Sequence, residues 1–350
     1  MCLYRIIKSA ILFTCILLSI SQEMIMADQT NSFSMDDPHL IVISAPSINN
    51  EYYKDYFKQL IAFDIAMVKA VSGRDSIVLL VDNDTKKVFE GKISEEIILE
   101  ASVVDIWIRD FGIVIPKNPV KFIYRPSYLD KVISDIIDTS FNRFINQLGI
   151  KIKQSDIIMD GGNFADNGLN RAVLTERIFL DNPSFSKKEL IEAIKSKTNL
   201  SEIAIIPEEQ RDTTGHVDGM VMRVSESRLL VVDHFNEPFR KKVLSTLKSS
   251  LPGVEVIEIP NFPSSVMVDG FPSAAGIYVN STITENYIYL PIFGKPEDKI
   301  MLKLIQSYTD KKVIPIYVAD IVDLGGSVRC LSFQLKGKLA HKLITFARDQ

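Results

Sequence analysis

Short apolar runs alternate along this chain with longer stretches in which apolar residues recur every three or four positions. The short runs predict strands at Leu40–Ser44, Ser76–Val81, Ile157–Met159, Glu202–Ile206, Arg228–Val232, Val254–Ile259, Tyr287–Leu290 and Val313–Tyr317. The longer stretches predict helices at Tyr52–Val71, Leu129–Leu148, Lys187–Ser196, Arg240–Ser249 and Lys299–Tyr308. Strands and helices that alternate in this way are typical of an α/β fold.

Polar clusters that contain glycine recur between these elements. They are Arg109–Gly112, Asp160–Asn163, Gly215–Gly219, Asp269–Gly270 and Asp323–Gly326, with spacings on the order of 50 residues, a range typical of repeated units. Any one cluster is most simply an ordinary turn, because Asp-Gly and Gly-Gly favour turns. Together they predict a ring of similar units whose loops meet at one centre.

The first residues have the pattern of a targeting segment. Arg5 and Lys8 precede an apolar run, and Ser19-Ile20-Ser21 places small residues at a plausible cleavage site. The apolar run of about 11 residues is shorter than the ~20 residues that cross a bilayer as a helix. An uncleaved membrane anchor is the alternative interpretation. We expect a signal peptide over 1–21, a linker over 22–37 and a single catalytic domain over 38–345. The protein would then be exported, periplasmic or secreted, with no stable membrane anchor after cleavage.

Composition narrows the possible partners and leaves one cysteine of interest. The net charge of −4 gives no support for nucleic-acid binding, which requires a basic surface. Of three cysteines, Cys2 and Cys15 lie in the expected signal peptide, so Cys330 would be the only thiol of the mature chain. Such a thiol is a buried bystander, an intermolecular link or a nucleophile.

Cys330 follows a Gly-Gly turn and opens a strand-like segment, so it can face a cleft. A cysteine nucleophile needs a base or a positive neighbour, and His216 is the best-placed of the four histidines. If its segment is extended, His216 and Asp218 share a face. A cysteine protease or transferase would use the same set. A metal site is not expected, because one cysteine without a Cys-x-x-C or His-x-x-x-His spacing supplies too few ligands.

Trp107 and Asp110 add a preference for a planar cation. Trp107 is the only tryptophan, three residues before an acid, and could form an aromatic wall beside the carboxylates of Asp110 and Asp218. A guanidinium presents five N–H donors in a fixed fork that carboxylates bind in pairs. A plain salt bridge between Asp110 and Arg109 would explain the acid equally well.

With these residues the sequence resembles the guanidine-modifying (pentein) superfamily, in the branch of Porphyromonas-type peptidylarginine deiminases and agmatine deiminases. The resemblance spans roughly residues 38–340 and rests on Trp107–Asp110, Asp160–Phe164, Gly215–Gly219, Tyr278–Asn280 and Gly325–Cys330, which occur in the family's order. It implies a five-bladed, pseudo-symmetric α/β propeller of ββαβ units.

The resemblance also implies residue roles. Cys330 would be the nucleophile, His216 the general acid and base, and Asp110 with Asp218 the clamp on the guanidinium. Substrate binding would further involve Trp107, Gly162 and Asn163 of the Gly-Gly-Asn turn, Asn280 and Arg125. No metal or organic cofactor is implied, and the partner is a small guanidinium compound or an arginine-containing peptide.

The implied chemistry is covalent hydrolysis. Cys330 would attack the central carbon, ammonia would leave, and water would release a ureido product from the thiouronium intermediate. We further expect the two acids to keep the free thiol protonated until the substrate cation arrives.

Departures from the family pattern affect the expected substrate. Ser327 and Arg329 replace the glycines and histidine usual before the nucleophile of agmatine deiminases, and Ile113 stands where a proline is usual. Together with the signal sequence, these departures favour conversion of peptidyl or free arginine to citrulline. Arg125 could pair with the carboxylate of such a substrate, or it could simply be a surface residue. Alternatives are conversion of agmatine to N-carbamoylputrescine, amidino transfer, a catalytically inactive guanidine-binding protein and an amide-hydrolysing cysteine enzyme.

Overall fold

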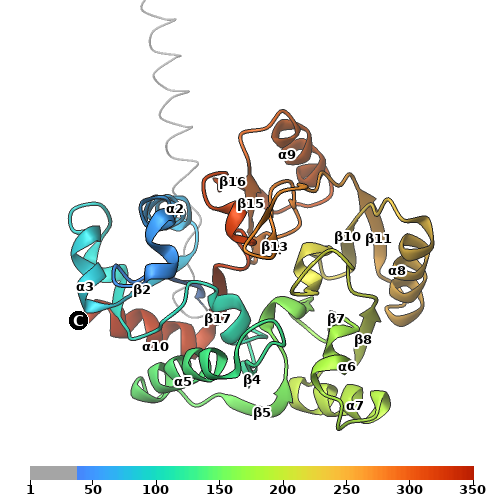
Figure 1. Ribbon diagram of the computed structural model, residues 1–350, viewed down its shortest axis with the longest axis horizontal. Helices are drawn as coiled ribbons and strands as arrows, with labels where there is room; N and C mark the ends of the chain where they lie inside the picture. The colour runs from blue at the N-terminus through green and yellow to red at the C-terminus, as the bar shows by residue number, and fades with distance from the viewer. Residues whose placement is uncertain (1–37) are drawn as a thin grey trace, which may run out of the picture. The chain divides into compact units, whose positions relative to one another are not determined.

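The computed structural model of the chain describes residues 38–350 (Figure 1). The expected signal peptide and linker therefore lie outside the described residues. Residues 39–350 form one compact unit, and its sheets are arranged around a common centre (Figure 1).

Five sheets of this unit each contain two parallel strands joined by a helix. In chain order the trios are β1 (His39–Ser44), α2 (Phe57–Val71) and β2 (Ser76–Val81); β4 (Val120–Ile123), α5 (Lys131–Gln147) and β5 (Lys153–Ile158); β7 (Arg171–Thr175), α7 (Lys187–Thr198) and β8 (Glu202–Ile206); β10 (Arg228–Val232), α8 (Glu237–Ser250) and β11 (Glu255–Ile259); β15 (Tyr287–Ile292), α9 (Glu297–Ser307) and β16 (Lys312–Tyr317). A helix crossover is the usual way to join parallel neighbours.

A further antiparallel strand completes four of the five units. β6 (Ala165–Asp166), β9 (Val221–Ser225) and β14 (Thr282–Ile283) pair with β7, β10 and β15, while a single bridge between Val114 and Val120 takes this place beside β4. In the first sheet the partner of β1 is β17 (Ser332–Lys336), from the far end of the chain. The predicted five-bladed propeller of ββαβ units is confirmed.

The burial of the strands explains why the sequence contains continuous apolar runs at these positions. Five of the six residues in β1 and in β2 are buried, as expected where helices cover a parallel sheet. All eight predicted strands and all five predicted helices are confirmed, with ends shifted by a few residues. The prediction omitted several elements, among them β4, β7, β9 and α10 (Gly337–Arg348), and the strand-like segment expected from Cys330 begins two residues later, as β17.

Within residues 38–350, no helix is both long enough and apolar enough to cross a membrane.

Candidate active site

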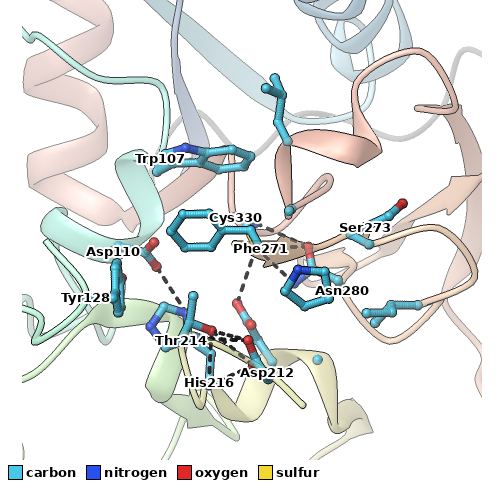
Figure 2. Close-up of a pocket in the computed structure, with 18 of the residues that line it drawn as sticks. Trp107, Asp110, Tyr128, Asp212, Thr214, His216, Phe271, Ser273, Asn280 and Cys330 are labelled. Atoms are coloured by element: carbon cyan, nitrogen blue, oxygen red, sulfur yellow. Dashed lines mark hydrogen bonds and ion pairs between the residues drawn. The ribbon is translucent and has the colours of Figure 1, made fainter. Parts of the chain in front are cut away.

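Loops from the different blades line one large cavity, with a volume of about 1180 Å³. Its lining includes all four predicted catalytic residues, Cys330, His216, Asp110 and Asp218. Figure 2 shows Cys330, Asp110 and His216 around the same space, with Trp107 along one side. The structure therefore brings together side chains that are up to 220 positions apart in the sequence, from Asp110 to Cys330.

Asn280 holds the loop that carries Cys330. Its side-chain oxygen accepts hydrogen bonds from the backbone N–H groups of Arg329 (3.2 Å) and Cys330 (3.3 Å). Its Nδ2 donates to the Cys330 Sγ over 3.1 Å. The predicted site asparagine thus lines the cavity and contacts the sulfur directly. An amide that donates to sulfur favours the thiolate form.

The surroundings of Cys330 otherwise oppose its ionisation. The sulfur is buried, and the nearest carboxylate oxygen, Asp218 Oδ2, lies 4.0 Å away. Burial, followed by the charges of Asp218 and Asp110, raises the pKa of the Cys330 thiol well above its usual value. The direction of this shift agrees with a thiol that stays protonated until a cation arrives.

His216 lies between two carboxylates. Its Nε2 is 3.1 Å from Asp160 Oδ2, and its Nδ1 is 3.7 Å from Asp110 Oδ1. Burial alone would lower the pKa of His216, but Asp110, Asp160 and Asp218 outweigh it and raise the pKa to about 10. These carboxylates therefore favour the protonated form of the imidazole, which can act as an acid.

Asp160 and Tyr128 are partners of His216 that the sequence reasoning missed. The Tyr128 hydroxyl donates to the same Asp160 oxygen over 2.8 Å and so fixes that carboxylate. Asp160 stands at the head of the noted Asp-Gly-Gly-Asn cluster, so a signal for it was present. Nothing in the sequence pointed to Tyr128.

The local geometry at His216 differs from the prediction. His216 itself is extended, but Val217–Gly219 form a short 3-10 helix, η5, so the segment is not a strand with residues i and i+2 on one face. Both side chains nevertheless line the cavity, where Asp218 reaches the sulfur of Cys330 and His216 reaches Asp160.

Asp110 is not paired with Arg109. Arg109 donates to the backbone oxygens of Gly161 (2.9 Å) and Phe164 (2.6 Å) and so ties α4 (Ile108–Phe111) to the next loop. The Asp110 carboxylate therefore lines the cavity without an arginine partner on its own helix. Burial raises its pKa to about 8, with Asp160 and Asp218 adding to the rise and His216 opposing it.

Three of the predicted substrate-binding residues lie outside the cavity lining. Gly162 lies beneath it, where its N–H donates to Asp110 Oδ1 over 3.2 Å, and Asn163 accepts a hydrogen bond from the N–H of Thr175. Arg125 forms a half-exposed ion pair with Asp135, 2.8 Å apart. Gly162 and Asn163 thus brace the site, and Arg125 is held by Asp135, so substrate contact by these three stays a prediction.

Trp107 does border the cavity, close to the nucleophile loop. A Cβ added to Gly326 would lie 2.4 Å from the Trp107 ring and 2.9 Å from the Cys330 Cβ. Only a glycine allows the indole and the nucleophile to approach so closely. The predicted aromatic wall is therefore in place beside the sulfur.

Acidic side chains far outnumber basic ones in the cavity lining. Six carboxylates line it: Asp105, Asp110, Glu209, Asp212, Asp218 and Asp269. Among its described lining residues, Arg211 is the only arginine or lysine. Such a lining attracts cations and repels anions. No group of three or more His, Cys, Asp or Glu side chains within residues 38–350 is arranged to hold a metal ion.

Comparison with known proteins gives the family of this chain. The family model described as "Porphyromonas-type peptidyl-arginine deiminase" matches residues 36–335. The chain belongs to this family. As a member of the Porphyromonas-type peptidyl-arginine deiminase family, it is a hydrolase that acts on amidines.

Relatives of this family member extend the comparison. A "putative agmatine deiminase" of Mycoplasma capricolum is 22% identical, over 77% of this chain and 85% of that one. The solved C. jejuni agmatine deiminase matches with a TM-score of 0.72 and 18% identity, over 85% of this chain and 96% of that one. Agmatine deiminase of Enterococcus faecalis has a TM-score of 0.72 and 17% identity, over 87% and 95%. At these identities the solved structures show the fold, and they confirm its expected pentein type.

Proposed function

We propose that this deiminase hydrolyses agmatine to N-carbamoylputrescine and ammonia. The observation that carries the proposal is the arrangement of Cys330, His216, Asp110 and Asp218 in one acidic cavity. The relatives described above carry the name agmatine deiminase, which supports this substrate over the arginine that the sequence favoured.

The charge of the cavity supports an amine at the far end of the substrate. Agmatine has only a positive charge there, whereas free arginine has a carboxylate beside its ammonium group. Arg125, the residue expected to pair with that carboxylate, lies outside the cavity lining, and six acids would repel the anion. Arg211 and His216, whose protonated form the neighbouring acids favour, would offset only part of this repulsion.

In the first step the guanidinium is held by Asp110 and Asp218 with its central carbon against the Cys330 sulfur. The positive charge of the substrate lowers the pKa of the thiol, and the thiol proton passes to solvent. The thiolate adds to the carbon, His216 gives its proton to the departing nitrogen, and ammonia leaves. A thiouronium bonded to Cys330 remains.

In the second step the now neutral His216 accepts a proton from a water molecule. The resulting hydroxide adds to the thiouronium carbon and the C–S bond breaks. The new hydroxyl group gives its proton to the departing sulfur, which leaves a neutral ureido product and returns Cys330 to the thiol form. The ureido product then departs, and His216 is again protonated.

Peptidylarginine is a second candidate, favoured by the size of the cavity. A volume of about 1180 Å³ exceeds what a small linear diamine derivative fills, since pockets for drug-sized ligands measure roughly 300–1000 Å³. An arginine within a peptide also carries no free carboxylate of its own.

The test is a ureido-product assay with agmatine, arginine, an internal-arginine peptide and a C-terminal-arginine peptide. We expect the highest kcat/KM with agmatine and no turnover by Cys330→Ser. Ammonia release from none of the four would refute the proposed activity. Release from a peptide but not from agmatine would make the second candidate correct.

We also propose that the protein acts after export, as the pattern of residues 1–21 indicates. N-terminal sequencing of the protein recovered from cell fractions should find the chain starting after Ser21 outside the cytoplasm. An intact Met1 in the cytoplasmic fraction would reject this.

A further inference from the structure

Exposed apolar side chains gather around the cavity that contains Cys330. Five large apolar residues, each 40–83% exposed, are part of its lining: Tyr52, Val104, Ile133, Ile136 and Phe235. Single exposed apolar residues are ordinary on protein surfaces, but a group at one opening usually marks a binding surface.

These five residues, hereafter the apolar ring, come from separate parts of the fold. Tyr52 lies in η1 (Glu51–Tyr56) after β1, and Val104 lies in the loop before α4. Ile133 and Ile136 lie in the first turns of α5, and Phe235 lies between β10 and α8. Because the five residues come from three blades and line the same cavity, they are not simply the exposed face of a single helix.

The cavity therefore has two chemically different regions. Cys330, His216, Asp110 and Asp218 are buried, whereas the apolar ring is exposed. A ligand that satisfies both regions has a guanidinium at one end and an apolar group at the other. The volume of about 1180 Å³ leaves room for such an extension.

We propose that the apolar ring binds an apolar group joined to the far end of the guanidinium substrate, as in an N-acylated or aromatic amide derivative. This rests on the proposed function, because it takes the guanidinium to be held at Cys330. An amide-linked group has no carboxylate, so it avoids the repulsion by the acids of the cavity, although it also lacks the amine charge of agmatine. Its apolar group would bury the apolar ring, which the charged amine of agmatine is too polar to cover.

The experiment compares N-benzoylagmatine with N-acetylagmatine, which differ only in the apolar group, with agmatine as the reference substrate. Burial of an aromatic ring corresponds to roughly a tenfold gain or more. We expect kcat/KM for the benzoyl compound to exceed that for the acetyl compound by about tenfold, mainly through KM. Phe235→Ser should reduce this ratio several-fold.

Leu180→Ser is the matched control. Leu180 is 64% exposed, and it lies outside the cavity lining, so its replacement should change neither the ratio nor agmatine turnover. Circular dichroism of Phe235→Ser verifies that a lower ratio does not reflect misfolding.

Three results would overturn the inference, and they differ from failure of the proposed function. Equal kcat/KM for the two acyl compounds would show that the apolar ring gives no preference. An unchanged ratio in a folded Phe235→Ser would do the same. Self-association detected by light scattering and abolished by Phe235→Ser would assign the apolar ring to a second copy of the chain. No turnover of any guanidine would instead refute the chemistry at Cys330.

Discussion

At the scale of single residues, Asp160 controls the acid that the proposed reaction needs. Its oxygen lies 3.1 Å from His216 Nε2 and helps to raise the pKa of that ring to about 10. In Asp160→Asn the pKa of His216 should fall. Because His216 donates its proton only below its pKa, the descending limb of the kcat profile should move to lower pH. We also expect kcat to fall by up to roughly 100-fold.

A pH–rate profile measures this effect, and Asp156→Asn provides the control. Asp156 lies on β5 with its side chain 76% exposed, beside Lys197, so its loss should leave the profile in place. An Asp160→Asn enzyme with lower kcat but an unshifted profile would mean that Asp160 has only a structural role.

Gly162 is a second residue whose importance follows from space alone. A Cβ there would lie 2.3 Å from His216 Nδ1 and 2.7 Å from Asp110 Oδ1, distances that real atoms do not adopt. Gly162→Ala should therefore displace both groups and lower kcat/KM by roughly 100-fold, since small misplacements are costly in catalysis. Gly219→Ala, where an added Cβ meets no atom within 4 Å, should be far milder. Equal kcat/KM values for the two variants would count against this account.

The protonation of Cys330 gives a prediction in which a variant gains reactivity. Burial contributes most to its raised pKa, and Asp218 contributes next. Asp218→Asn should therefore lower the pKa of the thiol and make it react with iodoacetamide at lower pH, although turnover falls. Mass spectrometry of the Cys330 peptide across a pH series measures this. Faster alkylation of the wild type than of the variant near neutral pH would disprove the charge argument.

At the scale of elements, the sequence predicted eight of the ten strands in the five parallel pairs, missing β4 and β7, and all five helices that join the pairs. It failed for β9, whose run Val-Met-Arg-Val-Ser is interrupted by Arg223. In the fold, Arg223 Nε donates to the backbone oxygen of Asp166 over 3.0 Å, a contact from the neighbouring blade. Such a strand depends on a tertiary partner that no local pattern contains.

The site shows the same difference between residues recognisable from a local pattern and residues whose role depends on tertiary contacts. Cys330, His216, Asp110 and Asp218 stand in short motifs, so their residue types and order were enough to find them. Tyr128 reaches Asp160 from 32 positions away, and Arg125 turns toward Asp135 instead of the cavity. The direction in which a loop side chain points depends on the packing of several blades, which the sequence pattern does not record.

Helix α7 allows a test of stability that is separate from catalysis. Ser186 accepts a hydrogen bond from the N–H of Glu189, and Glu189 accepts one from the N–H of Ser186, which forms a capping box. Ser186→Ala should lower the free energy of unfolding by about 1 kcal/mol. The described lining of the cavity contains no residue of α7, so kcat/KM should not change.

Denaturant unfolding checks this value, with Ser245→Ala as the control. Ser245 is an exposed serine within α8, where alanine is at least as favourable for the helix. A loss of activity in a folded Ser186→Ala enzyme would indicate a link between α7 and the site that the geometry does not contain.

At the scale of the whole molecule, closure of the ring and placement of the nucleophile are coupled. β17 pairs with β1 in antiparallel register, Leu335 opposite Leu40, and so joins the two ends of the described chain. Cys330 lies two residues before β17, and its backbone oxygen accepts a hydrogen bond from the N–H of Arg109 over 3.2 Å. The contact that joins the two ends of the described chain therefore also places the sulfur near the clamp.

The most direct test of the account is to look for the bond between Cys330 and the substrate carbon. The enzyme is mixed with agmatine, quenched in acid during turnover and digested for mass spectrometry. We predict a mass increase of agmatine minus ammonia on the Cys330 peptide, absent in Cys330→Ser. Turnover with no adduct on that peptide, together with an active Cys330→Ser enzyme, would contradict it.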